Sequence, residues 1–165
     1  MDAATIRRLF AYTDWANARI AQAIEAIADE QFTRSLGGSF GSIADTLAHV
    51  LGADWIWLRR WRGESPTAAP EWTHSRDRTV LFDAMRIVRS DRTAWLTQLT
   101  DDKLSTMLHS KRLSGETLSM SLDDALLHVA NHATYHRGQI ATMLRQVGAV
   151  APATDFSLYV VENMT

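Results

Sequence analysis

The sequence predicts an all-α protein, a four-helix bundle in which residues 1–165 form one domain. Three observations lead to this class. Four long segments repeat apolar residues at the three- and four-residue spacing of an amphipathic helix. Segments rich in glycine or proline lie between them. The chain has 165 residues, of which 46% are hydrophobic, and this is enough to bury one core.

The first two expected helices cover residues 3–28 and 43–62. In the first, helically spaced apolar positions include Ile6, Phe10, Ile20, Ile24 and Ile27. The glycine-rich sequence "SLGGSFGS" at 35–42 then interrupts the periodicity. Ser42 precedes the second helix and Asp45 follows three residues later, a pattern close to a capping box.

The third expected helix covers residues 76–100 and follows a loop at 63–72 that contains two prolines. Residues 101–120 lack helical periodicity. Within them, "SGET" is typical of a turn between two short extended segments, which predicts a small hairpin.

The fourth expected helix begins at Ser121, again with an acidic residue, Asp124, three positions later. It ends at Gly148, because glycine readily adopts the left-handed conformation that stops a helix. The tail at 151–165 is apolar enough to pack onto the body of the protein.

Composition excludes several classes of function. The net charge of −2 gives no electrostatic reason to expect a nucleic acid as partner. No apolar stretch approaches the roughly 20 residues of a membrane span, and the N-terminus shows no secretory signal, so we expect a cytoplasmic protein that does not enter membranes. The chain has no cysteine, so a bound metal would need imidazole, carboxylate, carbonyl or water ligands.

Two histidines lie on one face of the fourth helix. His136 occupies a core position of the apolar seam, where leucine would be expected, and His132 lies one turn earlier on the flank of the same face. Two imidazoles at this spacing can share a metal ion. The same spacing also occurs by chance, and His136 would then be a core imidazole with a hydrogen-bond partner. A zinc-protease motif is excluded because Ala133 stands where its glutamate would follow.

For two polar residues of the second helix, His49 and Asp54, the helical periodicity predicts different degrees of burial. At 100° per residue, His49 falls far from the apolar arc, which predicts an exposed side chain. Asp54 falls inside the arc. A buried carboxylate needs a partner, so we expect Asp54 to pair with an arginine or to orient a ligating histidine.

Three further residues of the fourth helix carry expectations. Gly138 destabilises a helix interior by about 1 kcal/mol relative to alanine, which favours close approach of another chain segment or of a ligand. Gln139 is expected to face solvent, and His128 is expected to be a surface residue.

The chain resembles the DinB family of four-helix metalloproteins, also called DinB/YfiT-like. Three motifs carry the resemblance, and "TDFSLYVVE" at 154–162 is similar to the family's usual tail. The motifs are "YTDWANARI" at 12–20, "SIADTLAHVLGADWIWLRRW" at 42–61 and "HVANHATYHRGQIATMLRQVG" at 128–148. They occur in the family's order and span nearly the whole chain.

The resemblance implies a divalent metal site formed by His49, His132 and His136, and thereby overrides the exposed position that periodicity predicts for His49. Zinc and nickel both suit imidazole ligands. Many family members have a histidine where this chain has Tyr135. Tyr135 or Arg137 is expected to stabilise charge on a leaving group.

The implied activity is that of a metal-dependent transferase that activates a low-molecular-weight thiol toward a small-molecule substrate. Two alternatives stay open: a metal-dependent hydrolase that uses bound hydroxide, and a non-catalytic metal-binding stress-response protein. Dimers are common in the family, so a homodimer is expected.

Overall fold

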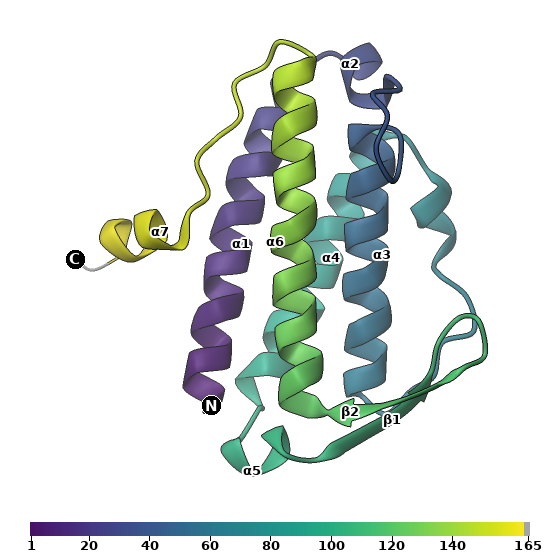
Figure 1. Cartoon of the computed structure of the whole chain (residues 1–165), viewed down its shortest axis with the longest axis vertical. Coiled ribbons are helices and arrows are strands. Elements are labelled where there is room, and N and C mark those ends of the chain that lie inside the picture. The colour runs from purple at the N-terminus through teal and green to yellow at the C-terminus, as the bar shows by residue number, and fades with distance from the viewer. Residues whose placement is uncertain (164–165) are drawn as a thin grey trace.

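Four long helices form the bundle in the computed structural model, which describes residues 1–163 (Figure 1). They are α1 (Ala3–Glu25), α3 (Ile43–Trp61), α4 (Arg78–Thr97) and α6 (Leu122–Gln146). All four expected helices are therefore confirmed, with ends that differ by a few residues at most, and the four-helix bundle is confirmed with them.

Six short elements connect or follow these helices: α2 (Asp29–Thr33), the 3-10 helix η1 (Glu71–His74), α5 (Asp101–Leu104), β1 (Met107–Lys111), β2 (Thr117–Ser121) and α7 (Phe156–Glu162). The strands β1 and β2 pair antiparallel, with Leu108 opposite Met120. Gly115 in the connecting turn has φ +89°, in the left-handed region that favours glycine. The hairpin predicted around "SGET" is therefore confirmed.

The predicted helix ends are present as well. The backbone N–H of Asp45 donates to Ser42 Oγ at 3.1 Å, and the backbone N–H of Asp124 donates to Ser121 Oγ at 3.4 Å. Gly148 has φ +82° directly after the last turn of α6. Local sequence signals thus position both ends of the helix that carries two of the histidines.

The core consists of two apolar clusters, one at each end of the bundle. The cluster at the hairpin end includes Phe10 and Trp61, and the cluster at the opposite end includes Ile24 and Leu47. Between them, the buried guanidinium of Arg92 on α4 forms ion pairs with Asp14 on α1 and Asp54 on α3. Asp54 therefore has the arginine partner that its buried position requires.

The C-terminal tail packs on α1 within residues 151–163, as expected from its apolar composition, and residues 164–165 of the predicted tail lie outside the described residues. The ring of Tyr12 contacts Phe156 at a centroid distance of 5.1 Å and Tyr159 at 5.7 Å. Figure 1 shows α7 at the outer side of α1, away from the other bundle helices. None of the helices formed by residues 1–163 combines the length and apolar character needed to cross a lipid bilayer.

Candidate metal centre

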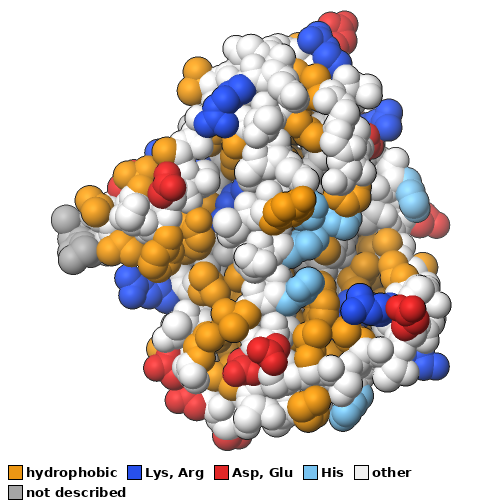
Figure 2. All heavy atoms as spheres, viewed as in Figure 1, with side chains coloured by type: hydrophobic (Ala, Val, Ile, Leu, Met, Phe, Trp, Pro, Cys, Tyr) orange, Lys and Arg blue, Asp and Glu red, His pale blue; other side chains and the backbone are white. Residues whose placement is uncertain are grey.

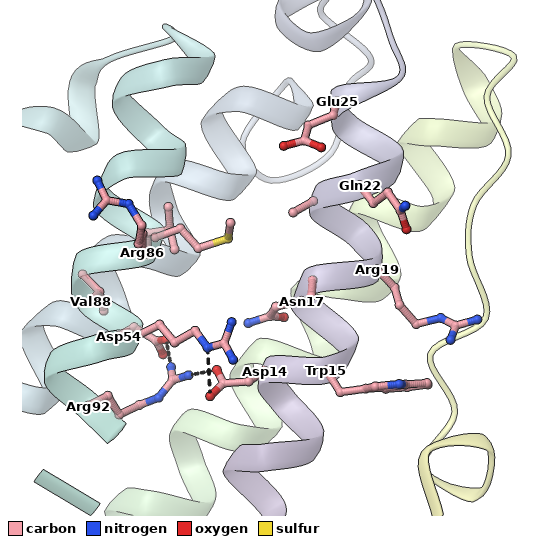
Figure 3. A pocket seen from close by; sticks show the side chains of 15 residues that line it. Asp14, Trp15, Asn17, Arg19, Gln22, Glu25, Asp54, Arg86, Val88 and Arg92 are labelled. Atoms are coloured by element: carbon pink, nitrogen blue, oxygen red, sulfur yellow. Dashed lines mark hydrogen bonds and ion pairs between the residues drawn. The ribbon is translucent and has the colours of Figure 1, made fainter. Parts of the chain in front are cut away.

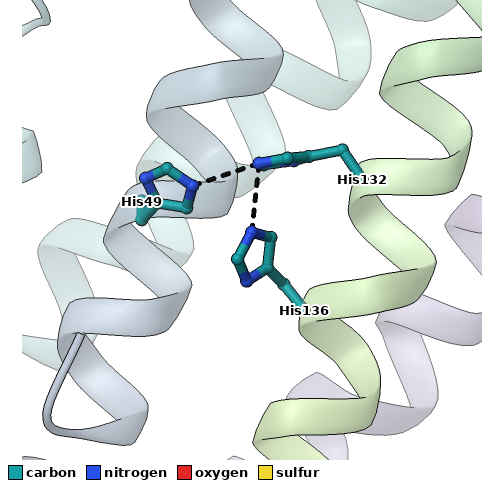
Figure 4. Close-up of side chains that lie close together, drawn as sticks. All are labelled: His49, His132 and His136. Atoms are coloured by element: carbon teal, nitrogen blue, oxygen red, sulfur yellow. Dashed lines mark hydrogen bonds between the residues drawn. The ribbon is translucent and has the colours of Figure 1, made fainter. Parts of the chain in front are cut away.

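Three histidine side chains converge between α3 and α6 (Figure 4). His132 Nε2 lies 3.1 Å from His49 Nε2 and 3.1 Å from His136 Nε2. One nitrogen from each ring can be chosen so that all three lie within 4.8 Å of one another. The structure thus brings together the three residues that the family resemblance implied.

Helix packing explains the position of His49. It is half-buried, and the exposed position predicted from periodicity is wrong. A helical wheel measures only the distance from the apolar stripe of a single helix. His49 lies away from that stripe, where α3 packs on α6, and its partner His132 comes from α6.

The spacing of the nitrogen atoms fits a single metal ion. Zinc binds imidazole nitrogen at about 2.0–2.1 Å, and tetrahedral geometry then separates two such nitrogens by about 3.3 Å. The two separations of 3.1 Å in this cluster are close to that value. The three side chains can therefore reach one ion with only small movements.

Gln139 orients one of the three rings. His136 Nδ1 lies 2.6 Å from Gln139 Oε1, so the ring N–H donates to the amide oxygen and the Nε2 lone pair is free to face the other two histidines. Gln139 is half-buried, and its expected solvent-facing position is wrong. Its three-residue separation from His136 was the signal that could have identified it.

Burial keeps the imidazoles of His49 and His132 neutral. Desolvation, followed by the charge of His136, lowers the pKa of His49 from 6.5 to about 4. Desolvation and the neighbouring histidines likewise lower the pKa of His132 to about 4. At neutral pH both rings have lone pairs available for a cation.

Phe40 covers the cluster from the glycine-rich loop before α3. Its ring stacks on His49 at a centroid distance of 3.9 Å, with 20° between the planes, and meets His136 edge-on at 5.5 Å. The sequence of this loop predicted only a break between helices, and the contact of Phe40 with the histidines was not predicted. The signal in the sequence was a single aromatic side chain, Phe40, in a loop rich in glycines and serines.

Tyr135 lies beside the cluster on the outer surface. Its side chain is 63% exposed, and its ring centroid is 5.0 Å from that of His136. Two surface hollows meet at Tyr135. One, of about 420 Å³, is also lined by His128 and His132, and the other, of about 320 Å³, is also lined by Gly138. A small molecule can therefore reach His132 from the larger hollow, on one side of this phenol.

Arg137 points away from the cluster. Its guanidinium is buried and donates to Tyr12 Oη at 3.2 Å, to Thr134 Oγ1 at 2.8 Å and to Asn17 Oδ1 at 3.3 Å. These contacts connect α6 to α1. The structure therefore does not bring Arg137 to the three histidines.

Two other expectations for α6 have different outcomes. His128 is exposed, as predicted. Gly138 is exposed too, and a Cβ added there would meet no atom within 4 Å in the part of the chain that the structure describes. The expected close approach of a chain segment at Gly138 is therefore wrong.

A cleft of about 560 Å³ lies between α1 and α4, at a different place in the bundle from the histidines (Figure 3). Asp14, Asp54 and Arg92 line its inner wall and are already paired with one another. Arg89 also pairs with Asp14, at 3.5 Å, so two guanidinium groups balance the two carboxylates, and the packing of α1, α3 and α4 explains the pairing.

Comparisons with known proteins agree with the fold. The family model described as "DinB family" matches residues 1–163. A Bacillus subtilis protein named Protein DinB is 28% identical over 96% of this chain and 95% of its own length. A crystal structure of a DinB-like protein from Bacillus cereus superposes with a TM-score of 0.68 at 18% identity, covering 88% of this chain and 94% of that one. At that identity the structural likeness concerns the fold alone.

Proposed function

The chain belongs to the DinB family, and we propose that it binds a divalent metal ion on His49, His132 and His136 to activate a low-molecular-weight thiol for transfer to an electrophile. The observation that carries this proposal is the convergence of three imidazoles from two helices, each able to offer one nitrogen within 4.8 Å of the others. The two separations of 3.1 Å support a common ion.

The donor set suits zinc or nickel and leaves coordination positions open. When bound, such an ion supplies a Lewis acid that lowers the pKa of a thiol or water in an open position. Three neutral imidazoles leave its charge of +2 uncompensated, which favours an anionic fourth ligand. Because the chain has no cysteine, a thiol ligand has to come from a small molecule.

The surrounding side chains supply orientation and shielding. Gln139 holds the ring of His136, and Phe40 shields one side of His49 from water. Of the two residues expected to stabilise a leaving group, Tyr135 lies beside the histidines, and we assign that role to its phenol. Arg137 is proposed as a positioning residue, because its guanidinium holds α6 against α1.

Metal titration of the apoprotein tests the first part of the proposal. Protein purified without a nickel column should bind one equivalent of Zn²⁺ or Co²⁺ in a calorimeter. His136→Ala should lose most of that affinity. His128→Ala, an exposed histidine on the same helix, is the matched control and should retain it. Equal affinity in wild type and His136→Ala would remove the basis of the proposal.

A thiol requirement tests the second part. Co²⁺-loaded protein should show a sulfur-to-cobalt absorption band when a thiol is added, and His136→Ala should not. Turnover of an ester or amide without any thiol would instead favour the hydrolase. A metal that raises the melting temperature without binding thiols or supporting turnover would favour the non-catalytic alternative. The expected homodimer is a separate proposal, which light scattering tests.

A further inference from the structure

Arg60 on α3 is a buried cation without a counter-ion. It is 7% exposed, and none of the ion pairs within residues 1–163 includes it. Its Nη2 donates to the backbone oxygen of Lys111 at 3.1 Å, and its buried Nε has no hydrogen-bond partner among those residues. By contrast, the buried Arg92 pairs with two carboxylates. An unpaired buried guanidinium is costly, so its retention favours an anionic ligand.

Arg60 belongs to a positively charged cluster. Its guanidinium lies 4.7 Å from the ring centroid of Trp57, and the ring of His128 lies 4.8 Å from that centroid. A second guanidinium, that of Arg112, belongs to the residue that follows Lys111, whose backbone oxygen accepts the hydrogen bond from Arg60. Trp57 thus joins the helix carrying Arg60 to the helix carrying His128.

The nearby carboxylates contact groups other than Arg60. Glu64 pairs with Arg59 at 3.2 Å, and Asp124, one turn before His128, accepts a hydrogen bond from Ser121 at 2.8 Å. Glu116 lies 3.8 Å from Arg112, a long contact between two exposed side chains. None of these carboxylates forms an ion pair with Arg60, so the guanidinium of Arg60 lacks a direct counter-ion within residues 1–163.

The cluster continues from the three histidines. His128 lies one turn before His132, with ring centroids 5.9 Å apart, and both line the hollow of about 420 Å³. Figure 2 shows histidine side chains gathered on this face, with hydrophobic side chains beside them toward the hairpin end. His128 thus lines the hollow beside His132, and the indole of Trp57 lies between the ring of His128 and the guanidinium of Arg60.

We propose that Arg60, assisted by Arg112 and His128, binds a carboxylate group of the small molecule that reaches the three histidines. Guanidinium groups bind carboxylates through two parallel hydrogen bonds, and the exposed Arg112 adds long-range attraction. The part that concerns a thiol rests on the proposed function, whereas carboxylate binding does not require it. The substrate class is thereby narrowed to thiols that carry carboxylates at some distance from the sulfur.

Reduced glutathione and its diethyl ester form a matched pair of probes, because they share one thiol and differ only in their carboxylates. On Co²⁺-loaded wild type, the sulfur-to-cobalt band should titrate at least about tenfold more tightly with glutathione than with the ester. Arg60→Gln should remove this preference without changing Co²⁺ affinity, and Arg60→Lys should restore part of it. Arg59→Gln, next to Arg60 but paired with Glu64, is the control and should keep the preference.

A second measurement separates this site from the metal chemistry. S-methylglutathione has no free thiol, so its binding to metal-free protein, followed by NMR of the Trp57 indole, reports the carboxylate site alone. One outcome would be that neither thiol gives the cobalt band, while S-methylglutathione binds to wild type and binds more weakly to Arg60→Gln. In that case the proposed thiol function is wrong and the carboxylate site is supported. Equal binding of acid and ester in wild type would overturn the inference, as would an unchanged preference in Arg60→Gln. If Arg60→Gln fails to fold, Arg112→Gln replaces it as the test, because the side chain of Arg112 is 58% exposed. Arg112→Gln must then weaken the preference for glutathione over its ester. An unchanged preference in that variant would also overturn the inference.

Discussion

Replacing Gln139 with leucine should weaken metal binding although no metal ligand is removed. Among the three histidines, only His136 has a hydrogen-bond partner for Nδ1 within residues 1–163, and that partner is Gln139 Oε1 at 2.6 Å. This bond selects the form of the ring that keeps the proton on Nδ1 and leaves the Nε2 lone pair for a cation. In Gln139→Leu the ring can take the other tautomer or rotate within its pocket.

The expected loss is about 10- to 100-fold in metal affinity, the usual effect of removing a group that orients a ligating histidine. It corresponds to about 1.4–2.7 kcal/mol of binding free energy. Metal binding places positive charge on the imidazole, so the lost hydrogen bond is charge-assisted. Such bonds contribute about 1.5–3 kcal/mol, in agreement with that range.

Competition for Zn²⁺ against a chromophoric chelator measures the effect. Gln146→Leu makes the same substitution at an exposed position of the same helix and should match wild type. Gln139→Glu retains an acceptor oxygen and should bind at least as tightly as wild type. A Gln139→Leu affinity within twofold of wild type would refute the assignment of Gln139 as the group that orients His136.

Three further predictions concern stability and access. His49 and His132 have pKa values of about 4 in the folded protein and 6.5 in the unfolded chain. Between these pH values the unfolded chain binds more protons than the folded protein. The metal-free protein should therefore lose stability as the pH falls from about 6.5 toward 4. Thermal melts should show this loss, and it should shrink when both histidines are replaced by asparagine; an equal loss in the double variant would contradict the cause. Arg92→Met should destabilise the protein by about 3–5 kcal/mol in urea unfolding, since Asp54 keeps a buried charge without a partner, and a loss below about 1 kcal/mol would show that the pair contributes little. Phe40→Ala removes the ring stacked on His49 and should speed zinc loss to excess chelator in stopped-flow experiments, whereas an unchanged rate would mean that Phe40 does not shield the centre.

Much of the fold was predictable because its determinants are local. Apolar residues at helical spacing set the four long helices, and Ser42, Ser121 and Gly148 set helix ends through contacts with residues a few positions away. The one-turn separation of His132 and His136 also follows from helix geometry alone. The family motif added His49, which periodicity had placed at the surface.

Tertiary structure decided which of these side chains meet. His49 reaches His132 only because α3 packs beside α6, and Phe40 reaches both helices from a loop without periodicity. Arg137 follows His136 in the chain, yet its side chain turns toward α1, because successive residues on a helix point about 100° apart. Sequence thus determined the helices and the side chains that each helix offers, while the choice of partners depended on helix packing, which brings together residues far apart in the chain.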